Sequence, residues 1–336
     1  MADVQMAAYR LGNFPVVAIA SRSVEKARNV AKRWDIPRVH ESPLALIEDP
    51  QIEIVDIAFP PHLQPQLIRA ALGQPHIKGI LAQKPLAMDG AEAGRLVAEA
   101  AAAGKILSVN QNMRFDQSMR ALKQLLEQNV LGTPVLATIE MRAIPHWQPF
   151  LREYDRLTLL NMSIHHLDVL RYLFGEVAQI STTVREDPRT SFPHFDGICC
   201  STLLFKSGVM AVSLEDVWAG PHDEKIKGNH FIRWRVEGTD GLAQGTIGWP
   251  DYPHGSPSTL DYCGRESDGE WIQPRWATRW FPHAFIGVME QLQYAIKAGC
   301  PPELDAADNV RTMMLVDAAY ASAREKRAVQ LAEFES

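Results

Sequence analysis

Up to about residue 130, the sequence alternates short apolar runs with segments of helical periodicity, and this alternation limits the possible folds more than any other feature. The runs are rich in β-branched residues, as is typical of strands buried on both faces. Between them, apolar residues recur at helical spacing, and Ser23 stands where an N-cap is expected. The expected strands are residues 16–20, 54–59, 77–82 and 106–109. Strands separated by helices predict βαβ units and a doubly wound, parallel, Rossmann-like α/β sheet.

The glycine-rich turn that opens a dinucleotide-binding fold is not found. Such a fold begins with a strand, a G-x-G-x-x-G turn and a helix, and its ribose-contacting position follows about 20 residues later. If Ser21 and Arg22 hold that position, the glycines fall near or before Met1, and residues 3–11 form the end of the first helix, with Gly12 at its C-terminal cap. We therefore expect an N-terminally truncated sheet that lacks its first strand, and no helix-terminus site for the pyrophosphate.

The carboxyl ends of the expected parallel strands are polar or turn-forming. Ligands of doubly wound sheets bind at this edge, so a cofactor is expected there. The residues assigned to it by position are Ser21, Arg22, Ser23, Pro60, Pro61, Gln83, Lys84 and Asn112. An acid at the ribose position suits NAD and an arginine suits the 2′-phosphate of NADP, and the first acid here, Glu25, already lies in the helix. We expect NADP in preference to NAD.

From Val135 the pattern changes to longer alternating strands joined by short turns. The expected strands are residues 135–143, 177–186, 198–205, 209–217 and 231–237, and the expected helices are residues 157–174, 282–298 and 306–324. The short turns predict antiparallel hairpins. We divide the chain into a dinucleotide-binding domain over residues 1–125 and an α+β substrate and oligomerisation domain, with an open, mostly antiparallel sheet, over residues 126–336.

Charge and hydropathy exclude several classes of partner. The formal charge of -6 gives no basic surface of the kind that a nucleic-acid backbone requires. No apolar run approaches the roughly 18 residues of a membrane span, and the N-terminus does not read as a signal peptide. We expect a cytoplasmic protein that binds a small molecule and neither nucleic acid nor membrane.

Three motifs occur in a characteristic order. They are Gln83-Lys84-Pro85-Leu86-Ala87 at a strand end, Val109-Asn110-Gln111-Asn112-Met113-Arg114-Phe115-Asp116 at the next, and Asn161-Met162-Ser163-Ile164-His165-His166-Leu167-Asp168 on a later helix. As an ordered set they resemble the family of glucose-fructose oxidoreductase and inositol dehydrogenase, called Gfo/Idh/MocA, from about Val16 onward. The resemblance implies hydride transfer between a nicotinamide cofactor and a hydroxyl or carbonyl of a sugar, inositol or related polyol. It also implies a homo-oligomer, a dimer or tetramer, built through the open face of the second sheet.

The resemblance further implies catalytic residues. Lys84 matches the lysine of the family's Glu-Lys-Pro signature, which contacts the reacting hydroxyl, although Gln83 replaces the glutamate. His165 matches a histidine that follows an aspartate by four residues, and Asn161 stands at the aspartate position. A histidine can take the hydroxyl proton near neutral pH, and a lysine can stabilise developing alkoxide charge. We expect His165 to act as acid or base, oriented by Asn161, while Lys84 polarises the hydroxyl.

Other candidates follow from position in these motifs. Arg114 matches a family position near the cofactor. The substrate contacts are assigned to Lys84, His146, Trp147, Asn161, His165 and Asp168. His166 and Asp168 could join His165 as metal ligands, but no further ligand stands at a diagnostic spacing, so no metal is expected.

Two other functions stay open. The first is a glycoside hydrolase that uses a bound NAD for transient oxidation, which would cleave glycosides without accumulating NADH. The second is a catalytically impaired binding or sensor member of the family, suggested by Gln83, Asn161 and the absent glycine turn together. Such a protein would bind its ligand without turnover.

Overall fold

The computed structural model describes residues 2–143, 149–216, 230–249, 253–265 and 267–334. The chain divides into two compact units. The first unit comprises Met1–Asn112 and Phe281–Met313, and the second comprises Met113–Trp280 and Met314–Ser336. Each unit therefore contains two separate stretches of the sequence, unlike the division at residue 125 that the sequence suggests.

The strands of the first unit are all parallel and fall into two hydrogen-bonded groups. One group pairs β1 (Ala18–Ile19) with β2 (Arg38–Val39). The other places β4 (Gly79–Gln83) between β3 (Ile54–Ile57) and β5 (Ile106–Asn110). The expected Rossmann-like parallel sheet is confirmed. The first observed strand, β1, is shorter than the predicted strand 16–20, because only two of those residues pair with a neighbouring strand.

Helices alternate with these strands, and all but the short helix Pro43–Ile47 lie where the periodicity predicts them. They are α1 (Ala2–Leu11), α2 (Val24–Trp34), α3 (Pro43–Ile47), α4 (Gln64–Leu72) and α5 (Gly90–Ala102). Ser23 caps α2, because its Oγ accepts a hydrogen bond from the backbone N–H of Lys26. Asp89 caps α5 in the same way through the N–H of Glu92. Ser23 stands where the sequence predicts a helix start.

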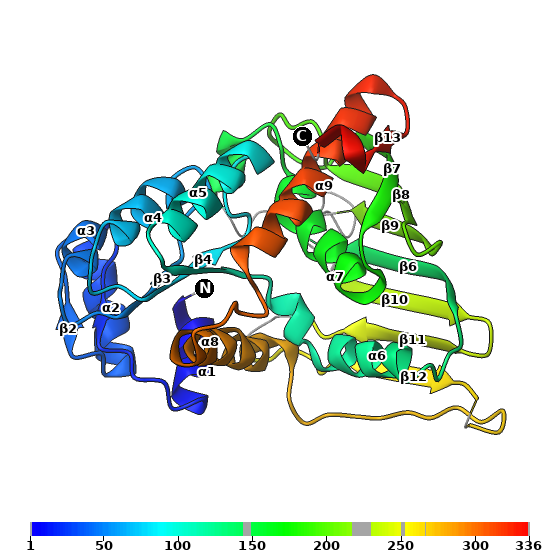
Figure 1. The fold of residues 1–336 in the computed structure, drawn as a ribbon, viewed down its shortest axis with the longest axis horizontal. Coiled ribbons are helices and arrows are strands. Elements are labelled where there is room, and N and C mark those ends of the chain that lie inside the picture. Colours follow the sequence, from blue (N-terminus) through cyan, green and yellow to red (C-terminus); the bar gives the residue numbers. More distant parts are fainter. Residues whose placement is uncertain (1, 144–148, 217–229, 250–252, 266, 335–336) are drawn as a thin grey trace. The chain divides into compact units, whose positions relative to one another are not determined.

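Helices cover both faces of the group formed by β3, β4 and β5. Figure 1 shows α4 and α5 on one side and α8 (Trp280–Ala298) on the other. A Cβ atom at Gly79 of β4 would lie 2.5 Å from Cδ1 of Ile296 in α8, so glycine permits this close approach. The segment that follows α8 lies against β5. There Ser108 Oγ donates to the Leu304 carbonyl at 2.8 Å. These contacts explain why residues 281–313 belong to the first unit.

An eight-stranded mixed sheet forms the framework of the second unit. Its order is β12-β11-β10-β6-β9-β8-β7-β13, and every neighbouring pair is antiparallel except β6 and β9. The strands are β6 (Pro134–Arg142), β7 (Val177–Arg185), β8 (Ile198–Phe205), β9 (Met210–Asp216), β10 (Phe231–Gly238), β11 (Leu242–Ile247), β12 (Thr259–Cys263) and β13 (Val329–Gln330). The open, mostly antiparallel sheet is confirmed.

Three strands of this sheet, β11, β12 and β13, are missing from the sequence prediction. β13 has only two residues, and β11 contains alanine, glutamine and glycine, which have low strand propensity. Gly245 of β11 has a structural reason, because a Cβ atom there would lie 2.1 Å from the Thr259 carbonyl oxygen. The neighbouring strand, rather than local preference, therefore selects glycine at this position.

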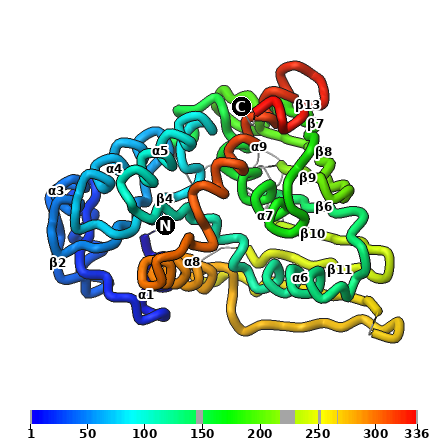
Figure 2. The backbone as a smooth tube through the Cα atoms, in the orientation of Figure 1, coloured from blue at the N-terminus to red at the C-terminus, as the bar shows by residue number. Residues whose placement is uncertain are grey.

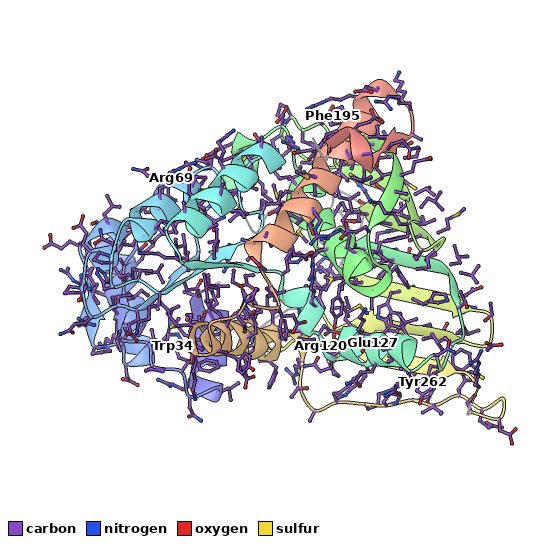
Figure 3. All side chains as sticks on the ribbon, viewed as in Figure 1. Trp34, Arg69, Arg120, Glu127, Phe195 and Tyr262 are labelled. Atoms are coloured by element: carbon purple, nitrogen blue, oxygen red, sulfur yellow. The ribbon has the colours of Figure 1, made fainter. Side chains whose placement is uncertain are left out.

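The helices of the second unit pack against one face of the sheet. Figures 1 and 2 show α6 (Gln117–Glu127) and α7 (Ile164–Phe174) lying along it, and the second half of α9 (Ala306–Glu325) also belongs to this unit. Arg120 of α6, labelled in Figure 3, lies over the Phe115 ring at 4.1 Å and the Tyr172 ring of α7 at 5.9 Å. Across the ranges given above, no helix combines the length and apolar character needed to cross a lipid bilayer.

Candidate functional site

Gln64 of α4 fixes the carboxyl end of β4 in the first unit. Its Nε2 donates to the carbonyls of Gln83 at 3.0 Å and Pro85 at 2.8 Å, and its Oε1 accepts from the Gln83 N–H at 2.7 Å. Gln64 is fully buried, and the Lys84–Pro85 peptide is cis. Lys84 therefore stands between two residues whose backbone is tied to α4. The sequence gives no signal for this role of Gln64, because its partners become neighbours only in the folded chain.

Lys84 has an altered protonation equilibrium. The side chain is partly buried, and desolvation of its ammonium group lowers the pKa of Lys84 from the ordinary 10.5 to about 7. Near neutral pH the group is therefore divided between ammonium and amine. It can donate a hydrogen bond to an oxygen in the first form and accept a proton in the second.

A row of side-chain amides runs from Gln83 to the end of β5. Asn110 Nδ2 donates to Gln83 Oε1 at 3.3 Å, and Asn112 Nδ2 donates to Asn110 Oδ1 at 3.2 Å. Gln83, Lys84 and Asn112 are residues that the sequence assigns to a cofactor site. The structure places all three at the carboxyl ends of adjacent parallel strands, where a ligand of this fold binds.

The remaining assigned residues of the first unit follow the other strands. Ser21, Arg22 and Ser23 come directly after β1, and the Arg22 side chain is exposed. Pro60 and Pro61 come after β3. Together with the amide row, these positions form the carboxyl edge of the parallel strands.

The buried side-chain amide of Gln111 bears on whether this edge suits a cofactor. Its side chain is 2% exposed, and neither its Oε1 nor its Nε2 has a hydrogen-bond partner within the described ranges. Burying an unpaired amide is costly, so a bound group that both donates and accepts would relieve this cost. The polar side chains at this edge are therefore compatible with a bound cofactor that carries hydrogen-bond donors and acceptors.

Asn161 and His165 lie on one helical segment of the second unit. The segment starts with a π-helical turn, Leu159–Ser163, and continues as α7, whereas the sequence predicts one regular helix over 157–174. Asn161 is 5% exposed and His165 is 8% exposed. The His165 ring meets the Trp280 ring edge to face, with centroids 6.1 Å apart. π-turns are rare and often occur at functional sites.

Asp196 anchors the start of this segment. Its Oδ1 accepts from the N–H of Leu157 at 2.6 Å, and its Oδ2 accepts from the N–H of Leu159 at 2.7 Å and from Tyr320 Oη at 2.6 Å. One carboxylate thus satisfies two backbone donors at the helix start. Burial raises the pKa of Asp196, while these hydrogen bonds lower it. No sequence pattern points to Asp196, because it lies far along the chain from the helix that it caps.

Arg114 and Asp168 bind each other in the second unit. Arg114 Nε donates to Asp168 Oδ2 at 2.6 Å, and its Nη2 donates to Oδ1 at 2.7 Å. Both side chains are buried, and the guanidinium group also lies 5.6 Å from the Tyr172 ring centre. The contacts of this pair are internal to the fold. Binding of cofactor by Arg114 and of substrate by Asp168 stays a prediction.

The other candidates of the second unit are not gathered into a metal site. His166 Nδ1 lies 3.1 Å from Glu215 Oε1, and Ser213 Oγ donates to the same oxygen at 2.9 Å. In the part of the chain that the structure describes, no group of three or more His, Cys, Asp or Glu side chains is arranged to hold a metal ion. His146 and Trp147, assigned to the substrate, lie outside the described residues.

Comparison with known proteins matches both halves of the chain. A family model described as "Oxidoreductase family, NAD-binding Rossmann fold" matches residues 2–111, and one described as "Oxidoreductase family, C-terminal alpha/beta domain" matches residues 123–331. D-apiose dehydrogenase of Paraburkholderia graminis is 25% identical over 96% of this chain and 84% of its own. Myo-inositol 2-dehydrogenase of Thermotoga maritima is 25% identical over 94% and 91%.

A solved structure shares the fold. It is an oxidoreductase from Agrobacterium radiobacter in complex with NAD+, L-tartaric acid and magnesium, with a TM-score of 0.83. The two chains are 22% identical, and the likeness covers 99% of this chain and 96% of the other.

The buried pair of Arg114 and Asp168 gives a stability prediction. Asp168→Leu removes the carboxylate that accepts from the buried Arg114 guanidinium, and Arg114→Met removes the guanidinium that donates to the buried Asp168 carboxylate. We expect each single change to lower the free energy of unfolding by about 3 to 5 kcal/mol, measured by urea denaturation. The double variant should lose less than either single variant, because it removes both charges of the pair together.

The exposed ion pair of Arg265 and Asp240 provides the control. Its side chains are mostly solvated, so Arg265→Met should cost at most about 1 kcal/mol. If the losses of the two buried single variants simply add in the double variant, the pair does not have the role described.

Proposed function

The chain belongs to the Gfo/Idh/MocA family of oxidoreductases, and on that premise we propose that it is an NAD(P)-dependent dehydrogenase acting on CH–OH groups. The proposed reaction transfers a hydride between a nicotinamide cofactor and a hydroxyl or carbonyl of a sugar, inositol or related polyol. The observation that carries the proposal is the ordered match of both domain models, with Lys84 at the carboxyl end of a parallel strand. The names of the D-apiose and myo-inositol dehydrogenases support a polyol substrate.

The side chains of the protein handle the proton of the reaction. The bound cofactor supplies the nicotinamide ring that takes or gives the hydride. In the direction of oxidation, the ammonium form of Lys84 donates to the substrate oxygen and stabilises the alkoxide as it develops. A ring nitrogen of His165 takes the hydroxyl proton. Asn161, one helical turn before His165, is proposed to orient the imidazole, and as an amide it adds no charge.

The lowered pKa of Lys84 predicts a pH dependence. The ammonium form that polarises the hydroxyl is lost as pH rises through about 7, because the folded chain holds the pKa of Lys84 at that value. We expect the rate of polyol oxidation, followed by NADPH or NADH formation, to fall above pH 7 in a limb that Lys84→Met removes. Lys84→Met and His165→Ala should each lower kcat by about 10²- to 10⁴-fold.

Lys32→Met, which changes an exposed lysine of α2, is the control and should leave the profile unchanged. A limb that depends on Lys84 but rises through pH 7 would instead make Lys84 the base. Full activity of His165→Ala would exclude His165 from proton transfer. Binding of cofactor and polyol without turnover would favour the sensor alternative, and glycoside cleavage without net reduction would favour the hydrolase.

We also propose that NADP is the preferred cofactor. Arg22 is exposed directly after β1, and no acid stands between β1 and Glu25. A guanidinium group at this position suits a 2′-phosphate and disfavours an acid-dependent NAD site. No residues are assigned to the pyrophosphate, because no G-x-G-x-x-G turn is present in the sequence.

Fluorescence titration with NADPH and NADH tests this preference. We expect NADPH to bind more tightly than NADH. Arg22→Ala should weaken NADPH binding by about tenfold or more, because it removes one charge-assisted hydrogen bond. The same change should leave NADH binding little changed. Arg28→Ala, at an exposed position later in α2, is the matched control. A preference for NADH in the unaltered protein would contradict the assignment.

A homo-oligomer, a dimer or tetramer, is proposed through the outer face of the second sheet. Buried and exposed residues alternate along β8, so the sheet packs on one face only. On the other face Leu204 and Met210 are paired across β8 and β9 and are 41% and 48% exposed. Exposed apolar groups on such a face suit association with a second copy.

Changing this pair to charged residues should dissociate the assembly. We expect Leu204→Glu together with Met210→Glu to shift the sedimentation coefficient at micromolar concentration to that of a monomer, because two buried carboxylates disfavour the interface. Tyr294→Glu alters a side chain of α8 that is also exposed and should have no effect. An unaltered protein that sediments as a monomer would contradict the proposal.

A further inference from the structure

Asp56, Gln83 and Asn110 share one face of the parallel sheet. The strand register pairs Asp56 with Leu81 and Gln83 with Asn110. Side chains two residues apart on a strand point to the same face, so Gln83 is the diagonal neighbour of Asp56. On this face α1 reaches Asp56, whose Oδ2 accepts from Tyr9 Oη at 2.5 Å and from Gln5 Nε2 at 2.6 Å.

The hydrogen bonds of the amide row have a direction. A carboxylate only accepts, whereas an amide has one accepting and one donating end. The accepting end of Gln83, Oε1, is used by Asn110, and the accepting end of Asn110 is used by Asn112. The NH2 group of Gln83, its donating end, is therefore available on the side of the amide that faces Asp56.

Two atoms on this diagonal complement each other. Gln83 Nε2, a donor, and Asp56 Oδ1, an acceptor, are both buried without a standard hydrogen bond among the residues that the structure describes. Burial raises the pKa of Asp56 to about 6, while Tyr9, Gln83 and Gln5 lower it. The strand register and these two atoms place the Gln83 amide beside the Asp56 carboxyl group.

We propose that Asp56 is a positioning residue that acts through Gln83. Its carboxylate holds the Gln83 amide with the NH2 group toward β3, and this sets the direction of hydrogen bonding along Gln83, Asn110 and Asn112. The inference rests on the proposed function, because Gln83 and Asn112 are the residues assigned to the cofactor.

The pairing also explains glutamine at position 83. A glutamate there would place a second carboxylate beside a buried one, and like charges at this distance disfavour ionisation of both. If residue 56 were neutral, a glutamate at 83 could still accept from Asn110, and the row would keep its direction. We therefore expect the fold to accept one carboxylate at these two positions, either at residue 56 or at residue 83, but not at both.

A double-mutant cycle tests this coupling. We expect Gln83→Glu to increase the unfolding equilibrium constant at pH 7.5 by about tenfold or more in the unaltered chain, but by at most about twofold in the Asp56→Asn background. The loss should shrink as pH falls toward 5, because the two carboxylates then share a proton. Tyr9, the titratable group that donates to Asp56, stays neutral throughout because burial raises its pKa well above the ordinary value.

Further readouts separate positioning from bulk stability. Carbon-13 NMR should give an Asp56 carboxyl pKa near 6 in the unaltered chain and a higher apparent value with Gln83→Glu. Asp56→Asn should weaken NADPH binding by about tenfold, and adding Gln83→Glu should restore it to within about threefold, which a purely structural role would not do. Gln74→Glu, a partly buried glutamine after α4, is the control and should cost the same in both backgrounds.

Equal costs of Gln83→Glu in both backgrounds would overturn the inference. Gln83→Glu by itself could fail to fold. In that case, folding of the double variant with Asp56→Asn supports the pairing. A double variant that does not fold, although Asp56→Asn alone folds, overturns it. The unfolding and NMR measurements need no cofactor or substrate. A failed dehydrogenase assay therefore bears on the proposed function alone, whereas an absent coupling bears on the pairing alone.

Discussion

Parallel pairing of β3, β4 and β5 is the constraint on which the candidate cofactor site depends. Parallel strands end at the same edge, so residues that follow them come together although they are far apart in the sequence. Gln83 and Asn110 become opposite partners in this register, and Lys84 follows directly. The apolar runs that build the strands are buried between two helical layers, which leaves the strand ends as the place where polar groups can gather.

The chain around Lys84 and the segment that carries His165 are each held by a buried polar partner rather than by local chain preference. Gln64 ties down the backbone on both sides of Lys84, and Asp196 ties down the helical segment that carries His165. Such groups need complete hydrogen bonding because unpaired polar atoms are costly inside a protein. Burial at this strand end has a chemical consequence, since desolvation lowers the pKa of Lys84 to about 7.

The secondary structure that carries strong local signals was predicted well. The cap Ser23, the parallel strands β3, β4 and β5 and the longer strands of the second sheet lie where periodicity and capping place them. The π-helical turn before His165 and the strands β11 to β13 were not predicted, because pairing partners and caps distant in sequence stabilise them. The assignment of residues 281–313 to the first unit has the same cause, since α8 packs on Gly79.

The sequence by itself determined the fold class, the family and the identity of the candidate residues Lys84 and His165. These depend on local periodicity and on short motifs, which the order of residues carries directly. Only the tertiary structure decided that Arg114 and Asp168 bind each other, that Gln64 and Asp196 hold the candidate segments, and that Asp56 lies beside Gln83. These pairs join residues between 19 and 54 positions apart, a separation that no local pattern spans.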